Sequence, residues 1–248
     1  MKGQKNNPVA VEGFDVNAYA QLMDSDYDGF FAFLNRLSDR RHTISKAGIK
    51  LERRLLFTWK KNGLLPFRAT VDADKKTWNR YSFTELSWIQ VLIALRKQGV
   101  GINRLKQIKD KLFLENFHQY VLPLLSHSQL GPNLSGAFKE KGLATDSDLK
   151  NVVVSQELLE ETQFSPFFCL LLSTVVMKAN IVLYIDEEAN AGMIDLDTMR
   201  SNPITGVVLA YDMLNNPSLT AINLTSIVTE LNKTVDITTK WLVSLRAK

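Results

Sequence analysis

The chain has 248 residues, of which 45% are hydrophobic and 23% charged, so it has enough apolar material for one large core or for two domains of ordinary size. Cys169 is the single cysteine, which excludes an intramolecular disulfide and a metal site built from several cysteines. The N-terminus is polar and the longest apolar run, at residues 167–177, has about 11 residues. We therefore expect neither a secretory signal nor a membrane span, and place the chain in the cytoplasm.

The charge is unevenly distributed along the chain. The net charge is +4, but residues 36–110 contain 18 Lys and Arg against 6 Asp and Glu, a net charge of +12, which leaves −8 for the rest. Clustered cations favour a polyanionic partner, because they release counterions from a phosphate backbone. The alternative is a solvated basic surface that binds no partner.

The first predicted elements are helical. Residues 1–28 form an acidic leader that contains the turn-forming sequence DSDYDG. Apolar residues at helical spacing predict a short helix over 30–37 and an amphipathic helix with an apolar stripe from Leu51 to Trp59. Gly63 ends this second helix, since glycine is preferred just after a helix C-terminus.

A wing and two further helices are expected next. Residues 67–80 are typical of two short extended arms around an Asp-Ala-Asp-Lys-Lys tip, as in a β-hairpin. Ser82 and Glu85 form the Ser-x-x-Glu pattern of a capping box, at the start of a helix whose apolar stripe reaches Leu95. Another amphipathic helix is predicted over 102–112. The order is therefore helix, wing, helix, helix.

The pattern changes in the C-terminal part of the chain. Residues 128–151 are rich in Gly, Ser, Asn and Asp, which predicts a linker or long loop. We expect a helix over 155–178, two strands within 181–197 joined by a turn, and a closing helix over 238–246. Two stretches fit strand or helix equally: 206–214 and 219–231.

One stretch within the basic segment resembles a known family. Its order Leu-x-x-Trp-x-x-x-Gly-Leu-Leu-Pro, from Leu56 to Pro66, is followed by the wing and by the sequence RYSFTEL…IQVLIALRKQGVGINRLKQI. This arrangement resembles the DNA-binding domain of the MerR family of bacterial transcription regulators, over roughly residues 50–112. Matching positions are held by Tyr81, Ser82, Glu85, Leu86, Ile89, Leu92, Arg96, Gly99 and Ile102.

The resemblance implies a winged helix-turn-helix, in which one helix enters the major groove of DNA while the wing and helix ends contact phosphates. The helix that ends at Gly63 would be the recognition helix, and Arg80 and Tyr81 would touch the DNA backbone. The side chains implied in DNA binding are Arg53, Arg54, Lys60, Lys61, Lys75, Lys76, Arg80 and Tyr81.

The chain also departs from the family pattern. Phe57 and Thr58 stand where the family usually has Arg-Tyr, and Asn79 stands where a wing arginine is usual. A long dimer helix after the wing domain is not evident, because the sequence around Pro123 lacks sustained heptads. These departures leave open a second interpretation: a protein-interaction module that retains a degenerate MerR-like domain without specific DNA binding.

Together these observations predict an α+β protein. Its segments are the leader at 1–28, a mainly helical MerR-like winged helix-turn-helix domain at 29–127, a linker at 128–151, and a mixed α+β accessory domain at 152–248. We expect a transcriptional regulator that binds double-stranded DNA. The accessory domain would mediate homodimerisation, or would sense a protein partner or a small-molecule effector.

An enzyme is the alternative class. The three histidines stand in scattered contexts, without a catalytic or metal-binding pattern. Either of two acidic clusters, Asp186 with Glu187 and Glu188 or Asp195 with Asp197, could hold a divalent cation, but a solvated hairpin edge is the favoured interpretation. We therefore expect no enzymatic activity, no cofactor and no metal site.

Overall fold

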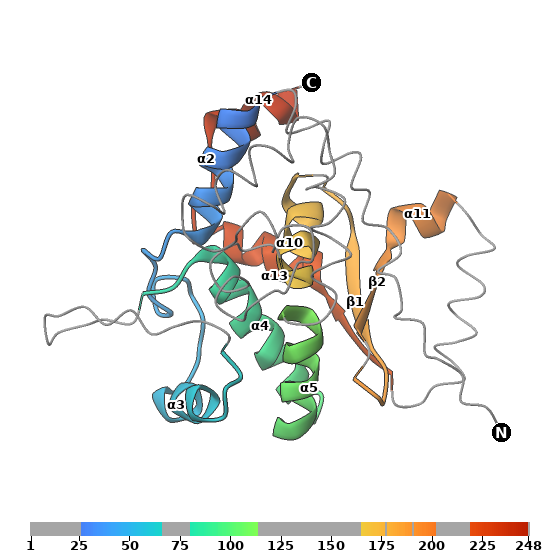
Figure 1. Cartoon of the computed structure of the whole chain (residues 1–248). Helices are drawn as coiled ribbons and strands as arrows, with labels where there is room; N and C mark the ends of the chain where they lie inside the picture. Colours follow the sequence, from blue (N-terminus) through green and yellow to red (C-terminus); the bar gives the residue numbers. More distant parts are fainter. Residues whose placement is uncertain are drawn as a thin grey trace, which may run out of the picture.

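The protein has a mixed α+β fold in which most of the described helices lie on one side of a small antiparallel sheet (Figure 1). A computed structural model describes residues 26–65, 80–113, 165–176, 178–189, 191–201 and 219–247. The elements are α2 (Tyr27–Ser38), α3 (Arg53–Lys61), α4 (Phe83–Lys97), α5 (Ile102–Phe113), α10 (Pro166–Val176), β1 (Ile181–Ile185), β2 (Ala191–Asp195), α11 (Leu196–Ser201), β3 (Thr220–Asn223), α13 (Leu224–Asn232) and α14 (Lys240–Ala247).

The sheet has the order β2-β1-β3, and both of its pairings are antiparallel. Leu183 at the centre of β1 lies opposite Met193 of β2 and Ile222 of β3. Alternate residues of β1 are buried, as expected of a strand with one face on the core. The predicted β1–β2 hairpin is confirmed, and the ambiguous stretch 219–231 contains a strand and a helix, β3 and α13.

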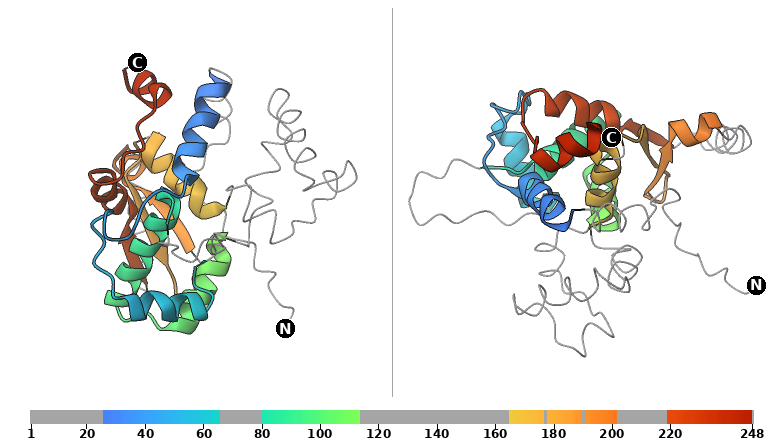
Figure 2. Two further views of the ribbon diagram at one scale, coloured as in Figure 1. Left: turned by 90° about the vertical axis from the view of Figure 1, so that its left-hand side faces the viewer. Right: turned by 90° about the horizontal axis from the view of Figure 1, so that it is seen from above.

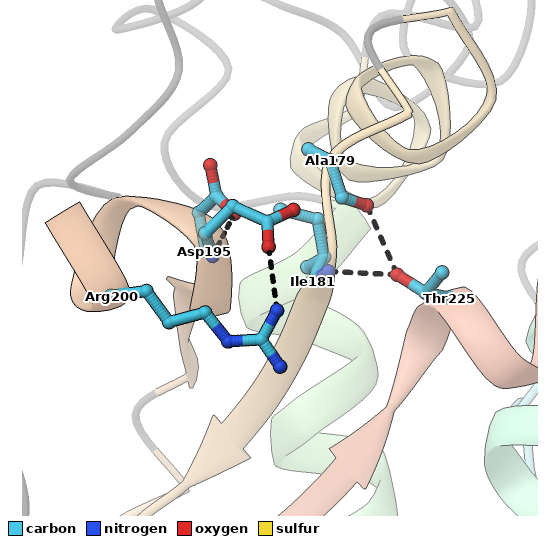
Figure 3. A network of polar contacts seen from close by, with 6 residues as sticks. Ala179, Ile181, Asp195, Arg200 and Thr225 are labelled. Carbon is cyan, nitrogen blue, oxygen red and sulfur yellow. Dashed lines mark hydrogen bonds and ion pairs between the residues drawn. The ribbon is translucent and has the colours of Figure 1, made fainter.

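Thr225 attaches the first turn of α13 to the start of β1 (Figure 3). Its hydroxyl accepts a hydrogen bond from the Ile181 amide at 2.7 Å and donates one to the Ala179 carbonyl at 3.0 Å. A β-branched threonine at a helix start thus satisfies two backbone groups that the sheet leaves unpaired. This contact fixes α13 against the sheet.

The middle and the C-terminal elements share one hydrophobic core. Trp88 of α4, Phe113 of α5 and Phe167 of α10 form an aromatic trio with ring centroids 5.1 to 5.3 Å apart. The helices α2 and α14 lie side by side at the opposite end of the molecule from α3 and α5 (Figures 1 and 2). There Trp241 of α14 packs against Phe30 of α2, with ring centroids 5.4 Å apart. The described parts of the two predicted domains are therefore packed together; the boundaries proposed for the linker lie outside the described residues.

Several helix boundaries follow the sequence signals. Ser82 accepts a hydrogen bond from the Glu85 amide while the Glu85 carboxylate accepts one from the Ser82 amide, so the predicted capping box is confirmed. The helices predicted over 30–37, 102–112 and 238–246 are present as α2, α5 and α14. Within the described residues, no helix is long and apolar enough to cross a membrane.

Other predictions fall outside the described residues. They concern most of the acidic leader at 1–28, most of the wing at 67–80, the linker at 128–151, the stretch at 206–214, and residues 155–164 of the predicted helix that continues as α10. Cys169 in α10 is buried, as its apolar neighbours indicate, and this burial raises the pKa of its thiol above the ordinary value.

Candidate nucleic-acid interface

The inner side of α3 is anchored by an apolar contact and a tight C-terminal turn. Trp59 is fully buried, and so is Leu64 just beyond the helix. Gly63 has φ 67°, a left-handed conformation that glycine adopts without a steric penalty. The Gly63 amide donates to the Lys60 carbonyl at 3.0 Å and the Leu64 amide donates to the Trp59 carbonyl at 2.9 Å. These two bonds form a Schellman motif, which turns the chain back into the core.

A side chain of α4 holds this turn in place. The indole N–H of Trp88 donates to the Leu64 carbonyl at 2.9 Å. Because Trp88 also belongs to the aromatic trio, the end of α3 is connected directly to the main core. The orientation of α3 is therefore determined by buried contacts rather than by its exposed side.

The outer side of α3 carries almost only cations. Five residues of the helix are exposed: Arg53, Arg54, Phe57, Lys60 and Lys61. We call these five residues the α3 face. Figures 1 and 2 show α3 at the edge of the molecule opposite β2 and α11. No hydrogen bond or ion pair joins the side chain of Arg53, Arg54 or Lys61 to another part of the chain that the structure describes.

Two of these cations are unfavourable for the helix itself. Arg53 and Arg54 occupy the first turn, which contains no acidic residue, and the N-cap Glu52 makes no side-chain capping bond. A helix N-terminus has a partial positive charge, so cations there oppose the helix dipole. A phosphate bound at this end would reverse that penalty. The two arginines therefore do not stabilise the start of α3 through the helix dipole.

Elsewhere in the basic segment, cations contact the protein's own acceptors. Arg40 forms an ion pair with Glu85 at 2.5 Å, and the Arg104 guanidinium donates to the backbone carbonyl of Asp186 in the β1–β2 turn. Further contacts of this kind are Arg36 with Asp236, Arg41 with Asp39, Arg96 with the Val100 carbonyl and Lys109 with Asp110. The excess positive charge predicted for residues 36–110 is thus not spread evenly over the surface.

The Arg40–Glu85 ion pair acts electrostatically on one cation of α3, Lys60. Glu85 is buried, and burial raises the pKa of its carboxyl although the Ser82 amide and Arg40 both lower it. Partial burial lowers the pKa of Lys60, with Arg40 acting in the same direction and Glu85 opposing it. Lys60 therefore interacts electrostatically with both members of this ion pair.

Of the other residues predicted to contact DNA, Arg80 is exposed and Tyr81 is buried. Arg80 is exposed, next to the bridge that pairs Tyr81 with His42. Tyr81 itself is a core residue: its side chain is 5% exposed, and its buried hydroxyl has no hydrogen-bond partner among the described residues. A side chain enclosed in this way does not reach a DNA backbone, so we leave Tyr81 out of the candidate interface. Lys75 and Lys76 lie outside the described residues.

Two exposed lysines outside the set predicted from the sequence precede α3. Lys46 and Lys50 are exposed in the segment that leads into α3, where residues 44–48 form turns. Gly48 has φ 71° in this segment, and the Ala47 carbonyl accepts a hydrogen bond from the Thr234 hydroxyl at 3.1 Å. The high density of cations at 36–61 is the signal that could have pointed to these lysines.

The structure describes the acidic residues considered for a cation site, but only one of the three histidines. The acidic turn at 186–188 is held against α5 by Arg104 and by Lys111, whose ammonium donates to the Glu188 carbonyl at 3.3 Å. No group of three or more His, Cys, Asp and Glu suited to a metal ion occurs in the described residues. Burial, reinforced by Arg41, lowers the pKa of His42; the other two histidines are outside the described residues.

Comparison of the chain with models of protein families, with curated proteins and with solved structures finds no match.

Proposed function

We propose that this protein is a bacterial, cytoplasmic transcription regulator that binds double-stranded DNA through a MerR-like winged helix-turn-helix at residues 29–127. The observation that supports the proposal best is the α3 face, where four exposed cations lie on a helix whose opposite side is fixed to the core. In this proposal α3 enters the major groove, and the predicted wing with Lys75, Lys76 and Arg80 holds the adjacent backbone.

The binding energy would come mainly from phosphate contacts. Each cation that neutralises a phosphate releases condensed counterions. The logarithm of the binding constant therefore falls linearly with the logarithm of the salt concentration. A protein with about six phosphate contacts loses roughly a thousandfold in affinity between 50 and 200 mM salt. Binding of a labelled duplex to the full chain, measured by fluorescence anisotropy at several salt concentrations, tests the proposal. Weak association without saturation at low salt would contradict it.

A second candidate function is a protein-interaction module. Phe57 favours this second function, because it is a large exposed apolar side chain at the centre of the α3 face. Aromatic side chains are common anchors at the centre of protein interfaces. The same salt titration separates the two functions. A protein-interaction module would not bind duplex DNA saturably, and its association would not depend steeply on salt concentration.

We further propose that the accessory domain at 152–248 mediates self-association or senses a ligand. Val243 of α14 is exposed and offers an apolar contact for a second copy. A groove of about 410 Å³ beside α10 and α13, with both polar and apolar side chains in its lining, is a candidate place for a small effector. It is lined by Thr174, Val175, Lys178, Thr225, Val228, Thr229, Asn232 and Lys233. Sedimentation equilibrium of the full chain tests self-association: a monomeric mass at micromolar concentration would contradict it.

A further inference from the structure

Phe57 occupies a distinctive position on the α3 face. Its side chain is 68% exposed, and it lies three or four residues from each of the four cations, Arg53, Arg54, Lys60 and Lys61. Residues three and four apart are neighbours on a helix surface, so the phenyl ring is at the centre of the face with a pair of cations one turn before it and a pair one turn after it. The ring contributes little to the core, because most of it remains in water.

The neighbours of Phe57 leave it as the central uncharged group of this face. Thr58, the next residue, directs its hydroxyl back to the Arg54 carbonyl at 2.9 Å, so this hydroxyl is engaged within the helix. Asn62 likewise donates its side-chain amide to the Thr58 carbonyl at 2.8 Å. Neither side chain competes with Phe57 for the centre of the face.

We infer that Phe57 is a specificity-determining residue that contacts the methyl group of a thymine in the major groove; this inference rests on the proposed function. When the flanking cations of a helix bind phosphates on both sides of a groove, the side chain between them faces the base edges. A phenyl ring has no hydrogen-bond donor or acceptor, so it does not read guanine or adenine as Arg or Asn does. The apolar group that the major groove offers is the thymine C5-methyl.

A contact between Phe57 and a thymine methyl would make binding depend on the DNA sequence, which the four cations alone would not do. Contacts of Arg and Lys with phosphates position the helix but carry no sequence information. A thymine opposite Phe57 would be favoured over uracil, which forms the same base pair but lacks the methyl group. Loss of one buried methyl corresponds to about a three- to fivefold change in affinity.

The experiment uses the full chain and duplexes selected from a random library. Each thymine of the selected duplex is replaced in turn by uracil, and the affinities of the wild-type protein and of Phe57→Ala are measured by fluorescence anisotropy. We expect at least one thymine at which uracil weakens wild-type binding by about three- to fivefold and leaves binding by Phe57→Ala unchanged. Gln107→Ala, which shortens an exposed side chain of α5, is the control and should retain the wild-type response.

The outcomes separate this inference from the proposed function. If the wild-type protein binds duplex with a steep salt dependence but shows no sensitivity to uracil, or if Phe57→Ala keeps the wild-type sensitivity, then the inference is refuted and the proposed function stands. If the wild-type protein retains no duplex at low salt, the proposed function is refuted and the inference with it. Phe57→Ala should fold normally, because the ring is exposed and alanine has the higher helix propensity.

Discussion

At the level of single residues, Tyr81 shows how a surface role implied by resemblance can conflict with burial. The resemblance of the sequence around Tyr81 to the MerR family implies a contact with DNA, but sequence alone does not reveal that this side chain, next to the bridge with His42, is buried in the core. Burial, reinforced by the charge of Glu85, raises the pKa of Tyr81 to about 12, so the phenol remains protonated at neutral pH.

We predict that Tyr81→Phe neither destabilises the protein nor weakens DNA binding. The hydroxyl is buried without a hydrogen-bond partner in the described part of the chain, so its removal leaves no group unpaired and should raise the free energy of unfolding by roughly 0 to 1 kcal/mol. Urea denaturation measures the stability, and fluorescence anisotropy the affinity. A loss of affinity in this variant with the fold intact would return Tyr81 to the interface.

Glu85 leads to a prediction about pH. Burial raises the folded pKa of this carboxyl above 4.5, so the folded state holds the proton more tightly than the unfolded state. The stability that this residue contributes is therefore present below the ordinary carboxyl pKa and is lost as pH rises through the folded pKa. We expect Glu85→Gln, which removes this titration, to become more stable relative to wild type as the pH is raised above 4.5.

Urea denaturation of wild type and Glu85→Gln between pH 4 and 8 measures this difference. Gln107→Ala, which removes no titratable group, is the control and should show a nearly constant difference from wild type. A difference between Glu85→Gln and wild type that shrinks as pH rises would mean that the ion pair with Arg40 outweighs the cost of burial.

At the level of elements, helix ends are the features that the sequence predicts best. Ser82 with Glu85 at a start and Gly63 at an end are local signals, because the groups they satisfy lie within a few residues. The strand–helix ambiguity at 219–231 could not be resolved from the sequence, since β3 is only four residues long and continues directly into α13. The pairing of β3 with β1 is a long-range contact that no local pattern reports.

The first turn of α3 gives a prediction in which stability and binding change in opposite directions. Replacing Arg53 and Arg54 together by Gln removes two cations from a helix N-terminus, where each costs about 0.3 to 1 kcal/mol. We expect the double variant to be equally or slightly more stable in urea denaturation, but to bind duplex DNA more weakly and with a shallower salt dependence. A loss of stability without a change in binding would instead assign these arginines a structural role.

At the level of the whole molecule, the aromatic trio joins the two parts that the sequence separates. The change of composition at 128–151 predicts a linker, yet Phe113 and Phe167 on either side of it have ring centroids only 5.3 Å apart. Sequence patterns identify which side chains are apolar but not which of them meet across 50 residues of chain. The sequence likewise shows which residues are charged but not which charges are paired. The contacts of Arg40 with Glu85 and of Arg104 with the Asp186 carbonyl become evident only in the folded chain.

We predict that the described parts of both predicted domains unfold as one cooperative unit. Phe167→Ala removes a fully buried ring from the trio and should lower the free energy of unfolding by about 3 to 5 kcal/mol. Hydrogen exchange should show that α4 and α5 lose protection together with α10. Unchanged protection of α4 and α5 in a Phe167→Ala variant that destabilises α10 would mean that the two parts are energetically independent.

The most direct measurement of the central claim compares two double charge reversals of equal size in a salt titration with duplex DNA. Arg54→Glu with Lys61→Glu changes the α3 face, whereas Lys97→Glu with Lys240→Glu changes exposed cations on α4 and α14. If α3 lies in the groove, the first variant loses most of the affinity and its logarithmic salt slope decreases by about 2, while the control stays close to wild type. Equal losses in both variants, or intact binding in the first with its thermal unfolding unchanged, would contradict the placement of DNA on α3.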